Sequence, residues 1–228
     1  MPPRYTLTQA STRLVELAEL GPDMSDDQVR EAIGIFPVFF RQVLVDHGFL
    51  DSQAKALATK FRDAGRRSAP WKPTSSKVPG RPQDGADGNR IRRWDLPADH
   101  KQYASERDAS LVEIRYYLQA LSFDDAPIVP HPSFSTAWSW LVEHKVAPGE
   151  YLEPIQLLPI SLREVLSNPR IITSGHIVPL DREGRHEPPN TSLIFSRSNQ
   201  MQGNMTLNEY LLLSDEIVQR HRERGTID

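Results

Sequence analysis

The chain contains no cysteine, so neither disulfide bonds nor thiolate-bound zinc can hold its fold together. A stable structure must therefore come from the packing of side chains in a hydrophobic core. With 228 residues, 38% of them hydrophobic, the chain is long enough to bury such a core as one large domain or two small ones. The absence of cysteine also excludes a thiol nucleophile.

Composition disfavours secreted and membrane proteins. The N-terminus lacks the apolar run of a secretory signal. The longest mostly apolar stretch, 32–40, is far shorter than the roughly 20 residues of a membrane span. We therefore expect a soluble, cytoplasmic protein with no membrane contact. Because the net charge is -3, any binding of nucleic acid must rest on local positive charge.

Apolar residues recur at helical spacing over much of the chain. Ser25 followed by Gln28 has the form of a capping box that begins one helix, in which Pro37 predicts a kink or a break. Ser133 and Ser161 are candidate N-caps of two later helices. With the helix that begins at Ser25, helices are predicted over 8–20, 51–64, 106–121, 134–145 and 161–167.

Strand patterns begin only after residue 169, at 170–174, 176–178 and 191–195, and helix resumes from Arg197 with a break near Gly203. The sequence therefore predicts an α+β fold that is mainly helical, with its strands at the C-terminal end. Composition divides the chain into a helical N-terminal region (1–68), a basic Pro/Gly-rich linker or DNA-contacting loop (69–104), a second helical region (105–168) and a C-terminal strand–strand–helix unit (169–228).

Positive charge is concentrated between Lys60 and Arg93, where ten basic residues stand against three acidic ones. Trp71 and Trp94 lie within or beside this stretch. Arginine-rich segments with aromatic residues suit phosphate contacts and groove insertion, although a solvated linker is the plain alternative. With Arg197 further along the chain, the candidate DNA contacts are Arg66, Arg67, Lys72, Lys77, Arg81, Arg90, Arg92 and Arg93.

The most informative residues lie between Gly175 and Gly203. His176 begins the string His-Ile-Val-Pro, Asn190 precedes the next predicted strand, and Asn199 lies on the following helix, at separations of 14 and 9 residues. Over about 30 to 45 residues this pattern resembles the HNH (ββα-metal, or His-Me finger) nuclease motif, including the HNH domain of RNA-guided CRISPR nucleases.

The resemblance implies a metal-dependent endonuclease that hydrolyses phosphodiester bonds in double-stranded DNA, with a ββα-metal unit at its C-terminal end. In that reading His176 is the general base that takes a proton from water. Asn199 is a ligand of a divalent metal, best Mg²⁺, and Asn190 fixes the loop that holds His176. His176, Asn190 and Asn199 are therefore the candidate catalytic residues.

One position departs from the family pattern, because most HNH motifs carry a metal-binding Asp immediately before the catalytic His, where this chain has Gly175. A substitute carboxylate from Asp181, Glu153 or a distant residue is open at this point. His186 lies in a charged loop and is interpreted as a solvated side chain.

Among HNH proteins, the size of the chain favours a type II restriction endonuclease, because about 165 residues precede the motif and can serve target recognition. No helicase, methylase or P-loop signature is visible. A palindromic target cut on both strands would favour a homodimer. Two alternatives stay open: an HNH-fold DNA-binding module that has lost catalysis, and a nonspecific, structure-directed or modification-dependent nuclease.

Overall fold

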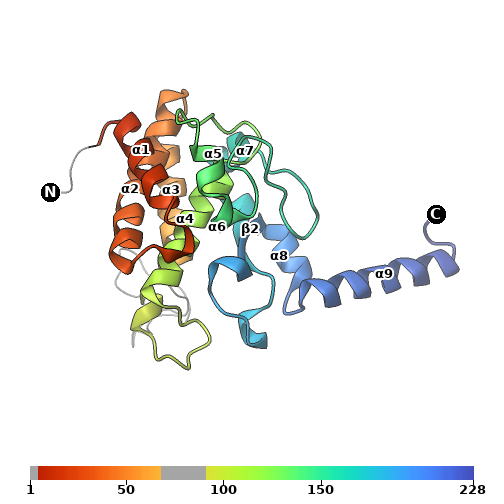
Figure 1. Ribbon diagram of the computed structural model, residues 1–228. Coiled ribbons are helices and arrows are strands. Elements are labelled where there is room, and N and C mark those ends of the chain that lie inside the picture. The colour runs from red at the N-terminus through yellow and green to blue at the C-terminus, as the bar shows by residue number, and fades with distance from the viewer. Residues whose placement is uncertain (1–4, 68–90) are drawn as a thin grey trace, which may run out of the picture.

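The computed structural model describes residues 5–67 and 91–228. Within these ranges the chain forms nine α-helices and one two-stranded sheet, so the mainly helical α+β prediction agrees with the structure. The elements, shown in Figure 1, are α1 (Leu7–Ala18), α2 (Asp26–Asp46), α3 (Asp51–Arg66), α4 (Glu106–Ala120), α5 (Phe134–Ala137), α6 (Ser139–Val142), α7 (Leu162–Ser167), β1 (Ile172–His176), β2 (Thr191–Phe195), α8 (Ser196–Gln202) and α9 (Leu207–Glu223).

Helix α4 forms the centre of the molecule, because every residue from Ala109 to Ala120 is buried. Helices α2 and α3 pack against it, and α1 packs against α2 (Figure 1). Aromatic rings fill the space between these helices: Tyr117 of α4 lies 5.2 Å from Phe40 and 5.5 Å from Phe61 between ring centroids. The same core continues to Ile172 and Leu193 of the sheet, so the predicted segments 1–68, 105–168 and 169–228 share one core.

Local sequence signals account for most of the helix boundaries. Ser25 and Gln28 form the expected capping box, and the Ser161 side chain accepts a hydrogen bond from the backbone N–H of Glu164. Of the kink or break predicted at Pro37, the break does not occur, because α2 continues from Asp26 to Asp46. Phe36, Phe39 and Phe40, which flank Pro37, are buried, and their burial offsets the backbone hydrogen bond that proline cannot form.

The segment predicted as one helix over 134–145 is instead two short helices, α5 and α6. The candidate cap Ser133 has helical dihedral angles rather than the extended ones of an N-cap, and Glu143 ends α6 with φ of 66°. The strand predictions 170–174 and 176–178 are replaced by the single strand β1, whereas β2 has the predicted bounds.

The C-terminal strands pair antiparallel, with His176 at the end of β1 opposite Thr191 at the start of β2. Helix α8 follows β2 directly and packs against both strands. The hairpin is attached to α4 because Gln119 accepts a hydrogen bond from the backbone N–H of Leu193 at 3.0 Å. None of the helices in the described ranges has the length and apolar character needed to cross a membrane.

Candidate active site

His176 lines a cavity of about 460 Å³ where the C-terminal half of α3 meets β1. We call it the His176 cavity. Three basic side chains and one carboxylate lie on its wall, which suits a phosphate-bearing ligand. Its lining residues are Lys60, Asp63, Ala64, Arg67, Arg93, Gln102, Thr173, Ser174, His176 and Leu180.

His186 contacts His176 directly, and the interpretation of His186 as a solvated residue is wrong. It is 1% exposed, and its Nδ1 lies 3.1 Å from Nε2 of His176. Its other ring nitrogen, Nε2, lies 2.7 Å from the backbone carbonyl oxygen of Gly65 at the end of α3. The two imidazoles and the carbonyl therefore form one continuous hydrogen-bonded chain.

The chemistry of the three groups determines which atom donates in each of these hydrogen bonds. The Gly65 carbonyl can only accept, so Nε2–H of His186 donates to it. Nδ1 of a neutral His186 then carries no proton and accepts from Nε2–H of His176. In this tautomer Nδ1 of His176 holds the free lone pair, so it is the nitrogen able to take a proton from water.

Electrostatics keep both rings neutral near pH 7. Burial, and then the positive charge of Arg93, lowers the pKa of His176 to about 4. Burial, with Arg93 and His176 contributing further, lowers the pKa of His186 well below its ordinary value. His176 is therefore neutral over the whole physiological pH range, so its ring holds a free lone pair there.

Arg93, one of the predicted DNA contacts, is buried (7% exposed) and lines the His176 cavity. Its guanidinium donates hydrogen bonds to three backbone carbonyls, those of Gly65 (3.1 Å), Ala64 (3.3 Å) and Gln102 (3.2 Å). Burial lowers its pKa to about 10, so it stays protonated at neutral pH. Arg93 therefore fastens the segment after residue 90 to the end of α3 and supplies a fixed positive charge beside His176.

Asn190 closes the loop between the two strands. Its side chain accepts from the backbone N–H of Val178 at 2.8 Å and donates to the carbonyls of Val178 (3.0 Å) and Arg185 (2.8 Å). Its own carbonyl accepts from the N–H of Ile177 at 3.1 Å. These bonds hold the backbone that follows His176 and the backbone that precedes His186, so Asn190 has the geometry of a loop-fixing residue.

Helix α8 approaches His176 through Gln202, a residue that sequence reasoning missed. The buried amide of Gln202 donates to the carbonyls of His176 (3.2 Å) and Ile177 (3.3 Å). Asn199, one turn earlier on α8, is exposed and is not among the described residues that line the His176 cavity. The sequence predicts that Asn199 and His176 face one pocket, but only His176 lines this cavity.

The predicted basic contacts lie in different environments. Arg67 lines the His176 cavity and forms an antiparallel bridge with Arg92, so the two ends of the basic segment meet beside His176. The Arg92 side chain is 61% exposed, and the guanidinium of Arg66 lies 5.2 Å from the centre of the Trp94 ring. Arg197 is exposed on α8, and Lys72, Lys77, Arg81 and Arg90 lie outside the described residues.

A side chain at position 175, where the family pattern expects a carboxylate, would displace a neighbour. A Cβ built on Gly175 would lie 2.2 Å from Cδ1 of Ile194, so the Ile194 side chain would have to move. Glu153 is fully buried and bound to the backbone N–H groups of Gln156 and Ile155 and to the hydroxyl of Ser198. Asp181 is paired with Lys101. Asp63, the carboxylate on the wall of the His176 cavity, is paired with Arg62 at 3.2 Å and with Arg67 at 3.6 Å.

Glu113 of α4 is a buried carboxyl behind the end of α3. It is 1% exposed, its Oε1 accepts from the Tyr117 hydroxyl at 3.0 Å, and its Oε2 has no hydrogen-bond partner among the described residues. Burial raises the pKa of Glu113 to about 7. The Glu113 carboxyl is therefore mostly protonated below about pH 7 in the folded protein, although Arg66 Nε lies 3.9 Å from its Oε2.

Replacing Glu113 with glutamine is expected to stabilise the protein at alkaline pH. Because the folded-state pKa lies above the unfolded value, the stability that Glu113 contributes is present below about pH 4.5 and is lost as pH rises through 7. The wild type should lose about 2 kcal/mol from this group between pH 5 and pH 8.5, and Glu113→Gln should not. Urea unfolding at both pH values measures this, and an identical pH dependence in the two proteins would contradict it.

Similarity to known proteins is found among solved structures. No protein-family model matches the sequence, and no curated protein matches it. Four chains of solved structures match, and one of them is described as "Crystal structure of a type II restriction endonuclease". The match to that structure has 21% identity and a TM-score of 0.45, and it covers 57% of this chain and 60% of the other. A similarity of this size does not establish a shared activity.

Proposed function

We propose that this protein is a metal-dependent endonuclease that hydrolyses phosphodiester bonds in double-stranded DNA, and that it acts as a sequence-specific type II restriction enzyme of the HNH class. The observation that carries the proposal is the hydrogen-bonded chain from His176 through His186 to the Gly65 carbonyl. It presents a neutral imidazole, with Nδ1 as its basic nitrogen, at the end of β1 and on the wall of a basic cavity.

In the proposed reaction, Nδ1 of His176 takes a proton from water as the water oxygen bonds to phosphorus and the phosphorus–oxygen bond to the leaving group breaks. The imidazolium that forms keeps its Nε2–H bond to His186, so the ring does not need to reorient during the step. Lys60 and Arg67 lie on the same cavity wall, where their positive charges favour an incoming phosphate.

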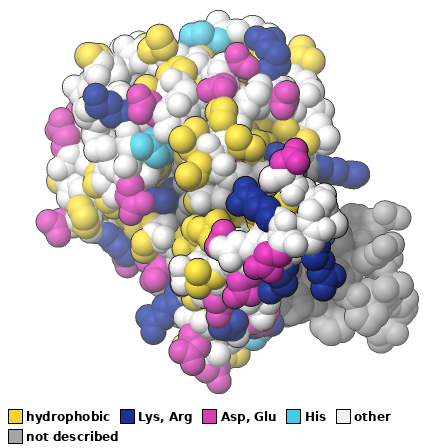
Figure 2. Space-filling view, turned by 90° about the vertical axis from the view of Figure 1, so that its right-hand side faces the viewer, with side chains coloured by type: hydrophobic (Ala, Val, Ile, Leu, Met, Phe, Trp, Pro, Cys, Tyr) yellow, Lys and Arg dark blue, Asp and Glu magenta, His cyan; other side chains and the backbone are white. Residues whose placement is uncertain are grey.

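DNA is the proposed substrate because the basic segment begins and ends at this cavity. Ten basic and three acidic residues lie between Lys60 and Arg93, and the bridge between Arg67 and Arg92 joins the two ends next to His176. Such an excess of positive charge supplies the sequence-independent part of DNA affinity. On the described part of the face shown in Figure 2, acidic and basic side chains are intermingled.

The described residues do not fit a complete protein-built metal site. Within 5–67 and 91–228 no three His, Cys, Asp or Glu side chains gather as ligands, and Gly175 cannot be replaced by a carboxylate without a clash. Mg²⁺ often binds through one or two carboxylates together with water and substrate phosphates. Asp63 is the carboxylate of the His176 cavity, and we propose it, rather than Asn199, as the protein ligand of such an ion.

Incubating the protein with a fully sequenced plasmid or phage DNA and Mg²⁺ tests the function. Discrete fragments whose mapped ends share one sequence are the expected result, and EDTA should abolish them. A smear would favour the nonspecific alternative, and cleavage only of methylated DNA would favour the modification-dependent one. Intact DNA with Mg²⁺, Mn²⁺, Ca²⁺ and Zn²⁺ in turn would contradict the proposal.

A second candidate is a DNA-binding protein that has lost catalysis. The glycine at position 175 and the exposed position of Asn199, outside the His176 cavity, favour it, because neither position then supplies a metal ligand beside His176. This candidate predicts a gel shift with duplex DNA and no cleavage with any of these metals. The enzyme predicts both binding and cleavage, so one set of reactions separates the two.

A further inference from the structure

The His176 cavity extends along α3 and β1, with His176 at one end. At that end His176 is connected to the carbonyl of Gly65 through one intervening imidazole. Nearer the start of β1, Phe61 of α3 packs against the ring of Tyr116 at 6.1 Å between centroids, and the Tyr116 hydroxyl is hydrogen-bonded to the hydroxyl of Ser174. Along the cavity, α3 and β1 therefore run in the same direction.

Lys60 lies toward the other end of this cavity from His176. It precedes Phe61 in α3 and is one of the residues that line the cavity. Because an α-helix rises about 1.5 Å per residue, Lys60 and Gly65 are separated by about 7.5 Å along the axis of α3. The cavity therefore has a neutral imidazole at one end and an amine toward the other.

Among the described cations of the cavity wall, Lys60 differs in having no partner within the protein. Arg67 is paired with Asp63 at 3.6 Å, and Arg93 donates to three backbone carbonyls. Lys60 is only partly exposed, yet it forms no hydrogen bond or ion pair with any described residue. Burial lowers the pKa of its amine, because desolvation disfavours the charged form, and this makes the ammonium group a stronger acid.

Hydrolysis of a phosphodiester requires groups on two sides of phosphorus, because the attacking water and the leaving oxygen lie roughly in line. The leaving oxygen gains negative charge as its bond breaks, and a proton donor at that oxygen lowers the barrier. A phosphate bound between His176 and Lys60 has a base on one side and an ammonium group on the other. The guanidinium groups of Arg67 and Arg93 do not suit this role, since arginine does not give up its proton in proteins.

We propose that Lys60 is the general acid of the proposed reaction, and that its Nζ donates a proton to the oxygen that leaves phosphorus. This role rests on the proposed function, whose reaction it completes. As the phosphorus–oxygen bond breaks, its electron pair stays on the leaving oxygen, which takes the proton from Nζ and leaves a neutral amine. His176 gains the proton of the attacking water, so the number of protons on the protein is unchanged, and exchange with solvent restores both groups.

A duplex with sulfur in place of the leaving oxygen tests this role. Because a thiol is far more acidic than an alcohol, the sulfur leaves without being protonated. The mapped ends of the wild-type fragments show which bridging oxygen leaves, and the sulfur is placed there. Lys60→Met removes the amine but keeps an apolar stem. Relative to the wild type in Mg²⁺, it should slow single-turnover cleavage of the oxygen duplex by about 10²- to 10⁴-fold and that of the sulfur duplex by less than about threefold.

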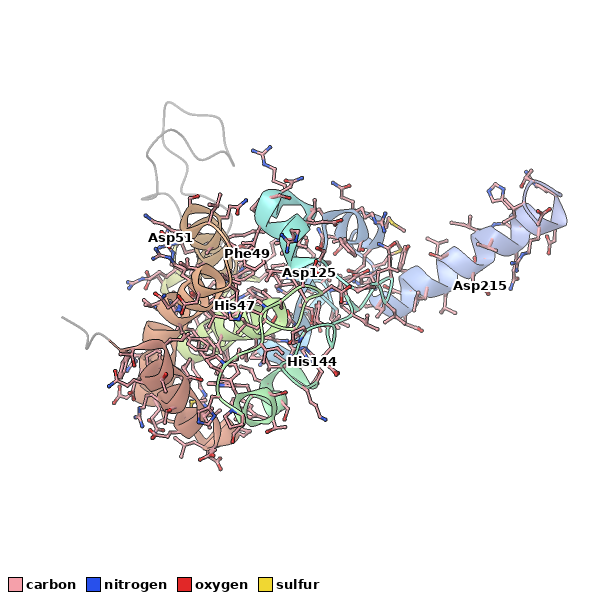
Figure 3. All side chains as sticks on the ribbon, turned by 90° about the horizontal axis from the view of Figure 1, so that it is seen from above. His47, Phe49, Asp51, Asp125, His144 and Asp215 are labelled. Atoms are coloured by element: carbon pink, nitrogen blue, oxygen red, sulfur yellow. The ribbon has the colours of Figure 1, made fainter. Side chains whose placement is uncertain are left out.

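Three further variants separate proton donation from attraction of phosphate. Lys60→Arg keeps the charge but cannot give up a proton, so it should bind DNA like the wild type, cleave the oxygen duplex slowly and recover on the sulfur duplex. His176→Ala should be slow on both, because the water still needs a base. Lys55→Met is the matched control and should cleave both duplexes normally. Lys55 is exposed, is not among the described residues that line the cavity, and lies one turn after Asp51, on the outside of the helical body (Figure 3).

The possible outcomes distinguish the role of Lys60 from the proposed function. If the wild type cleaves and Lys60→Met is as fast as the wild type, or equally slow on both duplexes, the role is overturned and the function stands. Full activity of Lys60→Arg on the oxygen duplex also overturns it, because charge alone would then suffice. A wild type that cleaves neither duplex overturns the proposed function and this role together. Circular dichroism confirms that each variant is folded.

Discussion

Replacing His186 with alanine is expected to slow DNA cleavage by about 10²- to 10⁴-fold, the range typical of a lost general base. His186 does not contact the reacting atoms in the proposed reaction. It acts through His176, because its Nδ1 accepts the Nε2–H of His176 at 3.1 Å and its own Nε2–H is held by Gly65. Without it, the ring of His176 loses both its fixed orientation and the tautomer that leaves Nδ1 basic. Single-turnover cleavage of a defined duplex measures the loss, with His176→Ala as the reference.

The pH profile separates this positioning role from general damage to the fold. Alanine at position 186 opens space for water beside His176, so the pKa of His176 should rise from about 4 toward its ordinary value. The acid limb of the rate profile should therefore move to higher pH. His186→Asn keeps an oxygen near the position of Nδ1 and should recover part of the rate. His47→Ala, which removes an exposed histidine at the end of α2, is the matched control and should cleave normally. A rate loss that is equal at every pH and is not recovered by asparagine would show that His186 only supports the fold.

Local sequence signals were sufficient for most of the fold. The capping box at Ser25, the cap at Ser161 and the strand-forming run 191–195 each involve residues a few positions apart, and each predicted element is present. Pro37 shows the limit of such signals, because its cost to the helix is local whereas the phenylalanines that offset it pack against distant helices.

The candidate site was only partly predictable. The motif spacing identified His176 and Asn190, which the structure joins through the loop between the strands. The contacts of His186 could not be predicted in the same way, because its partner Gly65 is 121 residues away in the sequence and the local context is a charged loop. A contact of that separation leaves no periodic pattern in the chain.

The orientation of helix α8 could not be predicted for a different reason. It has only seven residues, too few for an apolar pattern to reveal which side faces the strands. The residues that turn inward are Ser198 and Gln202, both polar, whereas Asn199 between them is exposed. The sequence alone therefore does not distinguish Asn199, which was expected to bind a metal, from Gln202, which holds the backbone of β1.

Replacing Gly65 with alanine is expected to lower the free energy of unfolding by about 1–3 kcal/mol, the usual cost of overpacking. A Cβ at this position would lie 2.8 Å from Cβ of Glu113 and 2.9 Å from its Cα, so α3 and α4 would have to move apart. That movement displaces the carbonyl that accepts from His186 and Arg93, at 2.7 Å and 3.1 Å. The variant should therefore lose cleavage activity together with stability, and urea unfolding at pH 7 measures the stability term.

Gly34 on α2 provides the matched control because it is also a helical glycine, but a Cβ there would meet no described atom within 4 Å. Gly34→Ala should raise the free energy of unfolding by about 0.5–1 kcal/mol, since alanine has the higher helix propensity. The same substitution is thus expected to lower the free energy of unfolding at position 65 and to raise it at position 34. Equal effects would mean that α3 and α4 are not in close contact at Gly65, and that the carbonyl anchoring His186 is not fixed by their packing.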